Sequence, residues 1–573
     1  MFIPTTPEEV RGRGWNELDV IIVSGDTYID SYYNGAAVIG HWLIDNGFKV
    51  GIIAQPNTES GDDITRLGEP KLFWSITSGA VDSMVANYTP TNKRRRDDDF
   101  TPGGINDRRP DRACIAYSNL IKKHIKGKPL VLGGIEASLR RVAHYDAWAD
   151  TVRRSILFDA KADIITYGMA ELSNLELARR IRDGQDIDDV KGICRLGSEV
   201  PKGYVTAPSF EECLENKDDF ITAFKNFNEN NDPANARGMV QKHGNRYLIQ
   251  NPPSRHVTQD ELDRIHSLDY ECEVHPYYLR QGNVKASETI RNSITTHRGC
   301  YGQCSFCAIS VHQGRTVISR SKSSIIEEAK KMTSKSGFNG IINDVGGPTA
   351  NMYHIDCPTK GVKGACKDRK CLFPKPCTKL PIDHSEQLYL LDEIRSLPNV
   401  RKVHISSGIR YDMIVADRIN GRRYVDALVK DHVPGQLKIA PEHTSRRVLE
   451  LMGKPGPDVL LKFKGMFDES NLEQGKKQFL TYYLMAAHPG CYMEDMEYLN
   501  DFVHRELKTN PEQVQIFTPT PSTVSTMMYH TRRDYDNTKD LKSEHSMQMK
   551  QKQKDVIIKS GGNRDAPGRR KTR

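Results

Sequence analysis

The chain has 573 residues, 37% of them hydrophobic and 27% charged, and its 82 Lys and Arg outnumber its 74 Asp and Glu to give a net charge of +8. The length exceeds that of one ordinary domain, so we expect two or three domains in a soluble globular protein. The positive excess is small for this length, so it permits contact with polyanions without indicating it.

The sequence shows no export or membrane segment. The N-terminal stretch MFIPTTPEEVRGRGWNELDV has no apolar run of the kind that a signal peptide needs. Apolar stretches such as VIIV at 20–23 are far shorter than the roughly 20 residues that span a bilayer. We therefore expect a cytoplasmic protein without a membrane partner. Because thiols stay reduced there, the 12 cysteines are expected to be metal ligands, catalytic groups or buried residues rather than disulfides.

Residues 1–215 alternate strand and helix patterns. Apolar runs that end in glycine or proline predict strands at 19–26, 48–56, 71–77, 128–138 and 161–168. Helical spacing predicts helices at 36–47, 118–127 and 171–184. This alternation is typical of a parallel sheet with helices on both faces, and such sheets bind ligands at the carboxyl ends of their strands.

Two regions lack this alternation. Residues 216–285 contain turn-rich stretches such as NFNENNDPANARG and QNPPSRHV, so we predict a linker region there. Residues 537–573 form a basic tail that is poor in core residues. Ordering it would cost roughly 1–2 kcal/mol per residue with little apolar burial to offset the cost, so we predict a mostly disordered tail. An RNA-binding arm is the alternative.

The alternation resumes over residues 286–536. Strands are predicted at 293–296, 339–344, 401–407, 436–440, 479–486 and 514–518. Helical stretches lie between them, at 323–337, 385–397, 421–431 and 496–507. Six strand–helix units of this kind indicate a parallel barrel or most of one, whose active site is built from loops at the carboxyl ends of the strands.

Three cysteines follow the first of these strands, in the sequence THRGCYGQCSFCAIS. Cys300, Cys304 and Cys307 are separated by three and two residues. Structural zinc usually takes four protein ligands, and a [4Fe–4S] cluster is normally closed by four thiolates. Three thiolates leave one iron without a protein ligand, and the amino and carboxylate groups of S-adenosylmethionine (SAM) can chelate that iron. An electron from the cluster then cleaves the sulfonium and releases a 5′-deoxyadenosyl radical.

The cysteine spacing, with Phe306 before the third cysteine, resembles the signature of the radical SAM superfamily. Further blocks resemble its YgiQ-like family, among them LGGIEASLRRVAHYD, YLIQNPPS, DVGGPTANMY, KIAPEHTS and QIFTPTPSTVSTMMYHT. The resemblance implies a Rossmann-like, cobalamin-binding-like N-terminal domain followed by a partial (β/α)6 radical SAM barrel. It also implies an enzyme of unknown reaction with a [4Fe–4S] cluster, SAM, an unidentified substrate and an electron donor such as flavodoxin or ferredoxin.

By the same resemblance, residues that end the barrel strands are candidates for SAM contacts. Gly346 and Gly347 resemble the glycine motif whose backbone approaches the methionine amino group, although Pro348 stands where an acidic residue is usual. The other candidates end the third and fourth strands: Ser406, Ser407, Arg410, Glu442 and His443.

A second cysteine set follows the second barrel strand, in CPTKGVKGACKDRKCLFPKPC. Four thiols could hold an auxiliary iron–sulfur cluster or zinc, although their spacing is not a standard zinc pattern; redox-active or structural thiols are the alternative. These residues are Cys357, Cys366, Cys371 and Cys377. Cobalamin is not predicted, because the nearest stretch to an Asp-x-His-x-x-Gly motif, DSYYNG at 30–35, has tyrosine in place of histidine.

Two other functions stay open. A non-catalytic iron–sulfur or zinc protein would bind metal mainly at residues 357–377 and would not turn over SAM. An RNA-modifying radical SAM enzyme is supported by the basic tail alone, since the three N-terminal cysteines and the terminal β-barrel of methylthiotransferases are not visible in the sequence.

Overall fold

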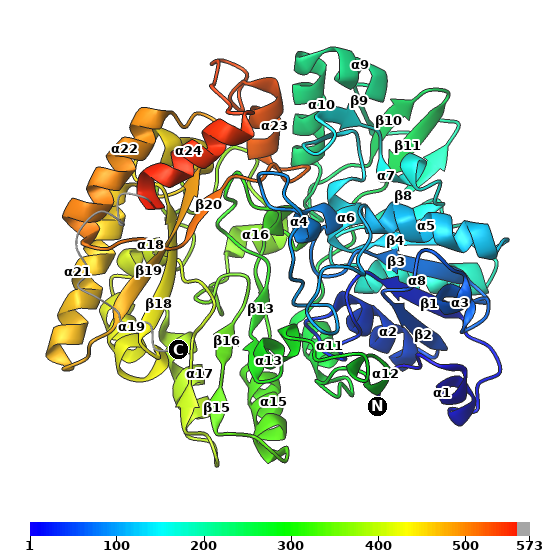
Figure 1. Ribbon diagram of the computed structural model, residues 1–573, viewed down its shortest axis with the longest axis horizontal. Helices are drawn as coiled ribbons and strands as arrows, with labels where there is room; N and C mark the ends of the chain where they lie inside the picture. The colour runs from blue at the N-terminus through cyan, green and yellow to red at the C-terminus, as the bar shows by residue number, and fades with distance from the viewer. Residues whose placement is uncertain (559–573) are drawn as a thin grey trace, which may run out of the picture.

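The computed structural model describes residues 1–558 of the chain. Figure 1 shows two α/β halves lying side by side, the N-terminal half in blue to blue-green and the second half in green to red. Within residues 1–558, every helix is too short or too polar to cross a membrane.

The N-terminal half is built on one nine-stranded sheet with the order β2-β1-β3-β4-β7-β8-β11-β10-β9. Five strands are parallel: β2 (Val50–Ala54), β1 (Val20–Ser24), β3 (Phe73–Thr77), β4 (Leu130–Gly133) and β7 (Ile164–Thr166). An antiparallel junction between β7 and β8 leads to the other strands: β8 (Ile193–Gly197), β11 (Arg246–Gln250), β10 (Met239–His243) and β9 (Val205–Ala207).

Helices cover both faces of this sheet, because the residues of its parallel strands are buried on both faces. Along β1, Ile21 and Val23 belong to one buried cluster, whereas Val20 and Ile22 belong to another on the opposite face. The first cluster is covered by α5 (Ala113–His124) and α6 (Gly134–Leu139), and the second by α2 (Gly35–Asp45) and α8 (Glu171–Arg182). Shorter elements surround them: α1 (Pro7–Gly12), α3 (Asp62–Thr65), α4 (Ser83–Asn87), β5 (His144–Asp146), β6 (Thr151–Arg153) and α7 (Ile156–Asp159).

The predicted linker at 216–285 is wrong in its first part. Strands β10 and β11 lie inside that range and belong to the N-terminal sheet. Helix α10 (Lys217–Glu229), which follows α9 (Phe210–Glu215), buries Phe220, Phe224 and Phe227 in the core. The sequence hid the hairpin because its strands carry polar residues such as Lys242 and Arg246. Irregular chain then connects α11 (Gln259–Ser267), α12 (Pro276–Leu279) and α13 (Ala286–Ile290).

The second half is a partial parallel barrel, which confirms the predicted fold class. All six predicted strands are present: β12 (Ser293–Thr295), β15 and β16 (Ile341–Ile342 and Asp344–Gly346), β17 (Lys402–Val403), β18 (Gln436–Glu442), β19 (Phe479–Ala486) and β20 (Val514–Ile516). Parallel pairings link β12 to β16, β15 to β17, and β18 to β19 to β20. A parallel bridge between Ile409 and Ile439 connects the third strand position to the fourth.

Helices surround the barrel and shield its core. They include α15 (Lys322–Ser334), α17 (Ser385–Arg395), α18 (Tyr411–Ala416), α19 (Gly421–Ala427), α20 (Arg446–Met452), α21 (Pro457–Glu473) and α22 (Met493–Phe502). Two π-helical turns extend α19 and α22, at Leu428–His432 and Val503–Leu507. Short elements near the barrel mouth are β13 (His297–Arg298), β14 (Ile318–Ser319), α14 (Ile309–His312) and α16 (Pro358–Lys363).

The predicted disordered tail begins too early. Helix α24 (Met547–Ile558) packs against the barrel, where the Gln553 side chain accepts a hydrogen bond from the Ala487 backbone (2.9 Å). Ile557 is buried, and Lys550 donates to the Tyr529 hydroxyl of α23 (Val524–Thr531). The sequence did not predict this helix, because it is rich in basic and polar residues and only a few of them, such as Gln553 and Ile557, are buried against the barrel. Residues 559–573 of the predicted tail lie outside the described residues.

The two halves are joined by buried polar contacts. Arg298, at the end of β13, pairs with Glu171 at the start of α8 (2.5 Å). The Tyr32 hydroxyl donates to the Ser293 carbonyl (2.7 Å), and the Ser522 hydroxyl donates to the Leu139 carbonyl (2.6 Å). The carboxyl edge of the N-terminal sheet therefore faces the loops that follow the first barrel strands.

Candidate active site

The three predicted ligand cysteines lie on one loop beyond β12 and β13. Backbone and side-chain donors point at two of the sulfur atoms: the Gly302 amide at Cys300 Sγ (3.3 Å) and Arg410 Nη1 at Cys304 Sγ (3.4 Å). The Cys307 amide donates to the Cys304 carbonyl (3.0 Å), which turns the loop back on itself. The structure thus places the triad at the carboxyl end of the first barrel strand, where parallel barrels carry their chemistry.

Burial sets the protonation of these thiols. Desolvation raises the pKa of Cys300 and raises that of Cys307 to about 12. As free groups at neutral pH both thiols are therefore protonated, and a metal must displace their protons to bind. Donors aimed at sulfur favour the thiolate form once it exists, because hydrogen bonds to the charged form lower its energy.

Arg410, predicted to contact SAM, is a buried cation held beside the triad. Its Nε and Nη2 atoms donate to both oxygens of Asp412 (2.8 and 2.5 Å), which leaves Nη1 for Cys304. Burial opposes the charge, but the Asp412 carboxylate outweighs burial and raises the pKa of Arg410. The guanidinium is thus permanently charged and already bidentate to a carboxylate.

Two lysines that were not predicted as site residues also approach the triad. Lys454 lies 3.8 Å from Glu442, and Lys370 donates to the Ser305 hydroxyl (3.1 Å) inside the cysteine loop. Burial raises the pKa of Glu442, which ends β18 in a left-handed conformation (φ 69°). No local pattern could have identified Lys454, because it lies in the loop after α20 and only the fold brings its charge near Cys307.

The predicted glycine motif ends the second barrel strand beside the first. Gly346 pairs with Thr295, and the Gly346 carbonyl accepts a hydrogen bond from the Thr296 amide (2.7 Å). A Cβ atom on Gly347 would lie 2.8 Å from the His297 ring, so only glycine fits at this position. The motif therefore needs its glycines for packing in this structure, whether or not a ligand approaches.

The two predicted serines differ in their surroundings. The Ser406 side chain is exposed and donates to the Asn343 carbonyl (2.7 Å). The Ser407 hydroxyl donates to the Asp344 carboxylate, which also accepts from both serine amides. Asp344 thus fixes the end of the third strand against the second, and Ser407 is the serine that faces the interior.

The remaining predicted residues around the triad have structural contacts. The Phe306 ring lies edge-on to His488, at a centroid distance of 6.4 Å, and packs against both cores. His443 Nδ1 accepts from the Thr444 and Ser445 amides (2.9 and 3.0 Å). Burial lowers the pKa of His443 to about 4, so the ring is neutral at neutral pH.

The insertion at 357–377 packs onto the cysteine loop. The Cys357 amide donates to the Tyr301 hydroxyl (3.4 Å), and the Gln303 side chain donates to Cys371 Sγ (3.8 Å). Cys371 is buried in a small apolar cluster, against which Cys300, Cys357 and Cys377 also pack. The insertion and the triad therefore share one packed region.

Over residues 1–558, no group of three His, Cys, Asp or Glu side chains is arranged around a point that would hold one metal ion. The described residues therefore offer no zinc site, because zinc needs its ligands around a single atom. A four-iron cluster attaches its thiolates to different irons and so needs them further apart. The donor set at the triad, three thiols with N–H groups aimed at sulfur, suits such a cluster.

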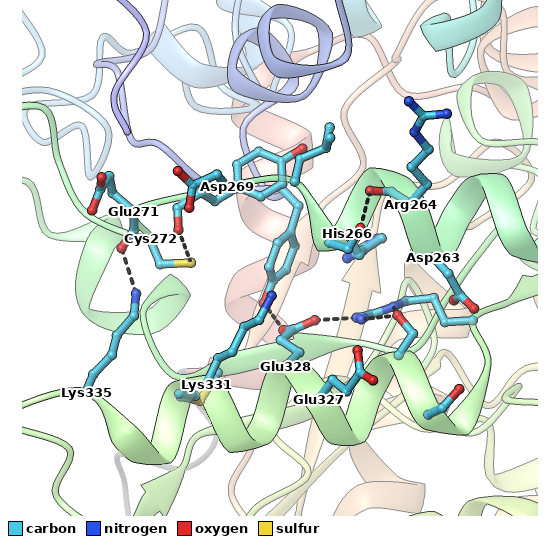
Figure 2. Close-up of a pocket in the computed structure, with 18 of the residues that line it drawn as sticks. Asp263, Arg264, His266, Asp269, Glu271, Cys272, Glu327, Glu328, Lys331 and Lys335 are labelled. Atoms are coloured by element: carbon cyan, nitrogen blue, oxygen red, sulfur yellow. Dashed lines mark hydrogen bonds and ion pairs between the residues drawn. The ribbon is translucent and has the colours of Figure 1, made fainter. Parts of the chain in front are cut away.

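A surface pocket of about 620 Å³ lies between α15 and the segment 263–272. Figure 2 shows Glu327, Glu328 and Lys331 projecting from the helix, and Lys335 reaching the Glu271 carbonyl. The described residues that line it include none of the predicted site residues. This pocket is thus separate from the cysteine loop.

Comparison with known proteins places the sequence among relatives that match nearly its whole length. A family model described as "Radical SAM N-terminal" matches residues 2–293. A UPF0313 protein of Fusobacterium nucleatum is 54% identical over 565 residues, which cover 98% of this chain and 100% of that protein. A UPF0313 protein of Thermotoga petrophila is 47% identical over 561 residues, which cover 97% of this chain and 98% of that protein.

Solved structures with a similar fold are more distant. One is the radical S-adenosylmethionine methyltransferase TsrM from Kitasatospora setae, with cobalamin and a [4Fe–4S] cluster bound. It is 14% identical in sequence, with a TM-score of 0.48, and the match covers 88% of this chain and 77% of the TsrM chain. The cobalamin-dependent S-adenosylmethionine radical enzyme OxsB is 10% identical, with a TM-score of 0.48, and the match covers 91% of this chain and 56% of the OxsB chain.

Proposed function

Because this chain belongs to the UPF0313 family of radical SAM proteins, we propose that it binds a [4Fe–4S] cluster through Cys300, Cys304 and Cys307 and uses it to cleave SAM. The observation that carries the proposal is the placement of three thiols on one loop at the carboxyl end of the first barrel strand, with N–H donors aimed at two sulfur atoms. The substrate and the overall reaction are not assigned.

When bound, the cluster supplies the electron that reduces the SAM sulfonium. The chain's own residues bind SAM and hold the ligand cysteines in place. We assign Arg410 to the Cys304 thiolate rather than to the SAM carboxylate, because Asp412 already occupies two of its three nitrogen atoms. The backbone at Gly346 and Gly347 is assigned to the methionine end of SAM. Glu442, paired with Lys454, is assigned to a polar group of SAM or substrate.

The proposal is tested by anaerobic reconstitution with iron and sulfide. The wild-type protein should absorb visible light and release 5′-deoxyadenosine from SAM after reduction, whereas the variant with Cys300, Cys304 and Cys307 replaced by Ala should do neither. Cys272→Ala removes a thiol outside the barrel and is the matched control, which should behave as wild type. Normal SAM cleavage by the triple variant would exclude the proposal.

A non-catalytic metal protein is the competing function, and it is favoured by the four thiols of the insertion. It predicts iron or zinc at residues 357–377 and no release of 5′-deoxyadenosine by the wild-type protein. An RNA-modifying radical enzyme is distinguished by RNA binding that survives removal of residues 559–573.

A further inference from the structure

A cavity of about 500 Å³ lies between the N-terminal sheet and the barrel. Its N-terminal wall is formed at the carboxyl ends of β3, β4 and β7, and its barrel wall includes Thr295, Gly346 and Gly347. The chain passes from β1 to β2 on one side of β1 and then to β3 on the other side, so the switch point of the sheet lies between β1 and β3. Ile22 of β1 and Thr77 of β3 line the cavity, which therefore lies where doubly wound sheets bind ligands. Its volume is within the range of small-molecule sites.

Two buried acceptors line this cavity without partners. Glu171 is 1% exposed, and its Oε1 atom pairs with Arg298 while Oε2 has no hydrogen-bond partner. Asn174 is 3% exposed, and its amide nitrogen donates to the Ala170 carbonyl (2.9 Å) while Oδ1 has no partner. The two residues are three positions apart and so share one face of α8. Buried acceptors of this kind are normally satisfied, so both oxygens indicate a ligand with N–H or O–H donors.

The charges that line the cavity disfavour an anion. Arg298 is the only arginine or lysine among the described lining residues, and Glu171 neutralises it. Burial lowers the pKa of His297 and of His312 to about 4, so neither ring is cationic at neutral pH. Asp344 adds a negative charge to the wall. A phosphate or carboxylate would therefore enter without an unpaired cation to receive it.

The other walls suit a flat ring. Tyr32 and Tyr33 line the cavity with ring centroids 5.0 Å apart, and both belong to the DSYYNG stretch at the start of α2. Ile39 and Met169 add apolar surface. Aromatic side chains stack on nucleic-acid bases whatever the base, and unpartnered acceptors match exocyclic amines and ribose hydroxyls.

We propose that this cavity binds an uncharged nucleoside, held by Glu171 and Asn174 and stacked on the tyrosine pair. Gly346 and Gly347 border both this cavity and the proposed SAM site, so the nucleoside is placed as the substrate. That role rests on the proposed function; the binding itself does not.

Calorimetric titration of the full chain with adenosine, guanosine, cytidine and uridine tests the proposal. Saturating S-adenosylhomocysteine keeps the SAM site filled. At least one nucleoside should bind, and its 5′-monophosphate should bind more weakly. Glu171→Gln should weaken binding by about tenfold, because it replaces a charged acceptor. Ile39→Trp, which fills the cavity from α2, should abolish binding. Glu176→Gln, on the exposed face of the same helix, is the matched control and should change nothing.

The outcomes separate this proposal from the proposed function. The variant lacking Cys300, Cys304 and Cys307 should still bind the nucleoside although it cannot cleave SAM. SAM cleavage without nucleoside binding would overturn the nucleoside site and leave the SAM chemistry intact. Binding that survives both Glu171→Gln and Ile39→Trp, or tighter binding of the monophosphates, would overturn it as well.

Discussion

At the scale of single residues, three cations from other parts of the chain lie around the cysteine loop: Arg410, Lys370 and Lys454. The spacing of Cys300, Cys304 and Cys307 predicted a shared loop because the three residues are close in sequence. Lys454 and Lys370 could not be predicted, since tertiary folding brings them to the triad from the loop after α20 and from the insertion. The SAM contact predicted for Arg410 stays a prediction, and the structure adds that Asp412, two residues along the chain, accepts from two of its three nitrogen atoms.

The buried Arg410–Asp412 pair predicts a sharp mutational effect. Arg410→Leu leaves the Asp412 carboxylate buried without its cation, so it should reduce the free energy of unfolding by about 3–5 kcal/mol. It should also lower the iron content after reconstitution, because Cys304 loses a donor. Denaturant titration and iron analysis measure the two effects. Arg418→Leu, at an exposed position nearby, is the control; equal stability of both variants would contradict the prediction.

A second pair predicts how stability depends on pH. Burial alone would raise the pKa of Asp417, but hydrogen bonds from His384 outweigh burial and lower the pKa to about 2. Since an unfolded aspartate titrates at about 3.9, the ionised form contributes about 2 kcal/mol that is present above pH 4 and lost as the pH falls toward 2.

Asp417→Asn should accordingly destabilise the protein at pH 7, and its difference from wild type should shrink as the pH falls from 4 to 2. Denaturation midpoints across this range measure the effect. Asp392→Asn, at an exposed position on α17, is the control and should show no such trend. A difference that stays constant with pH would refute the assignment.

At the scale of elements, strands with a clear apolar pattern were predictable and those without one were not. The five parallel strands of the N-terminal sheet are mostly apolar runs, whereas β18 and β19 of the barrel alternate outward-facing and buried residues, and the sequence shows both patterns directly. The β10–β11 hairpin depends on pairing with β8, and α24 depends on packing against the barrel. Neither partner can be recognised from the local sequence.

The insertion at 357–377 belongs to this scale, because its four thiols act together or not at all. We predict that the variant lacking Cys300, Cys304 and Cys307, purified anaerobically, retains iron in the insertion, since no group of side chains over residues 1–558 is arranged to hold a single zinc ion. Additional replacement of its cysteines by Ala should remove that metal: Cys357, Cys366, Cys371 and Cys377. Elemental analysis of both variants measures the bound metal. A triple variant without iron or zinc would show that the insertion only covers the barrel mouth.

At the scale of the whole molecule, the two halves share one buried cluster in addition to the cluster that each has of its own. Phe517, Met527 and Tyr529, near the end of the barrel sequence, belong to the same buried cluster as Trp74 and Leu132 of the N-terminal sheet. Residues hundreds of positions apart therefore complete one core. Division of the chain into an N-terminal domain and a barrel at residue 285 followed the sequence pattern, but it cuts through this cluster.

A split-chain experiment tests this shared core. A fragment of residues 286–558 should aggregate when expressed alone, since it exposes the apolar side chains of α23. Expression together with residues 1–285 should restore a soluble complex, which size-exclusion chromatography would detect. A soluble, monomeric 286–558 fragment with a cooperative melting transition would contradict the prediction.

The same shared core imposes an order on biosynthesis. The N-terminal sheet leaves the ribosome long before α23 does, yet α23 supplies part of the apolar cover of that sheet. Domains usually fold as units during synthesis, the N-terminal one first. In this chain the nascent N-terminal half must wait, with part of its core exposed, until the last described helices have been translated. A translational pause or a chaperone would therefore affect the yield most during this interval, and less through the stability of the finished protein.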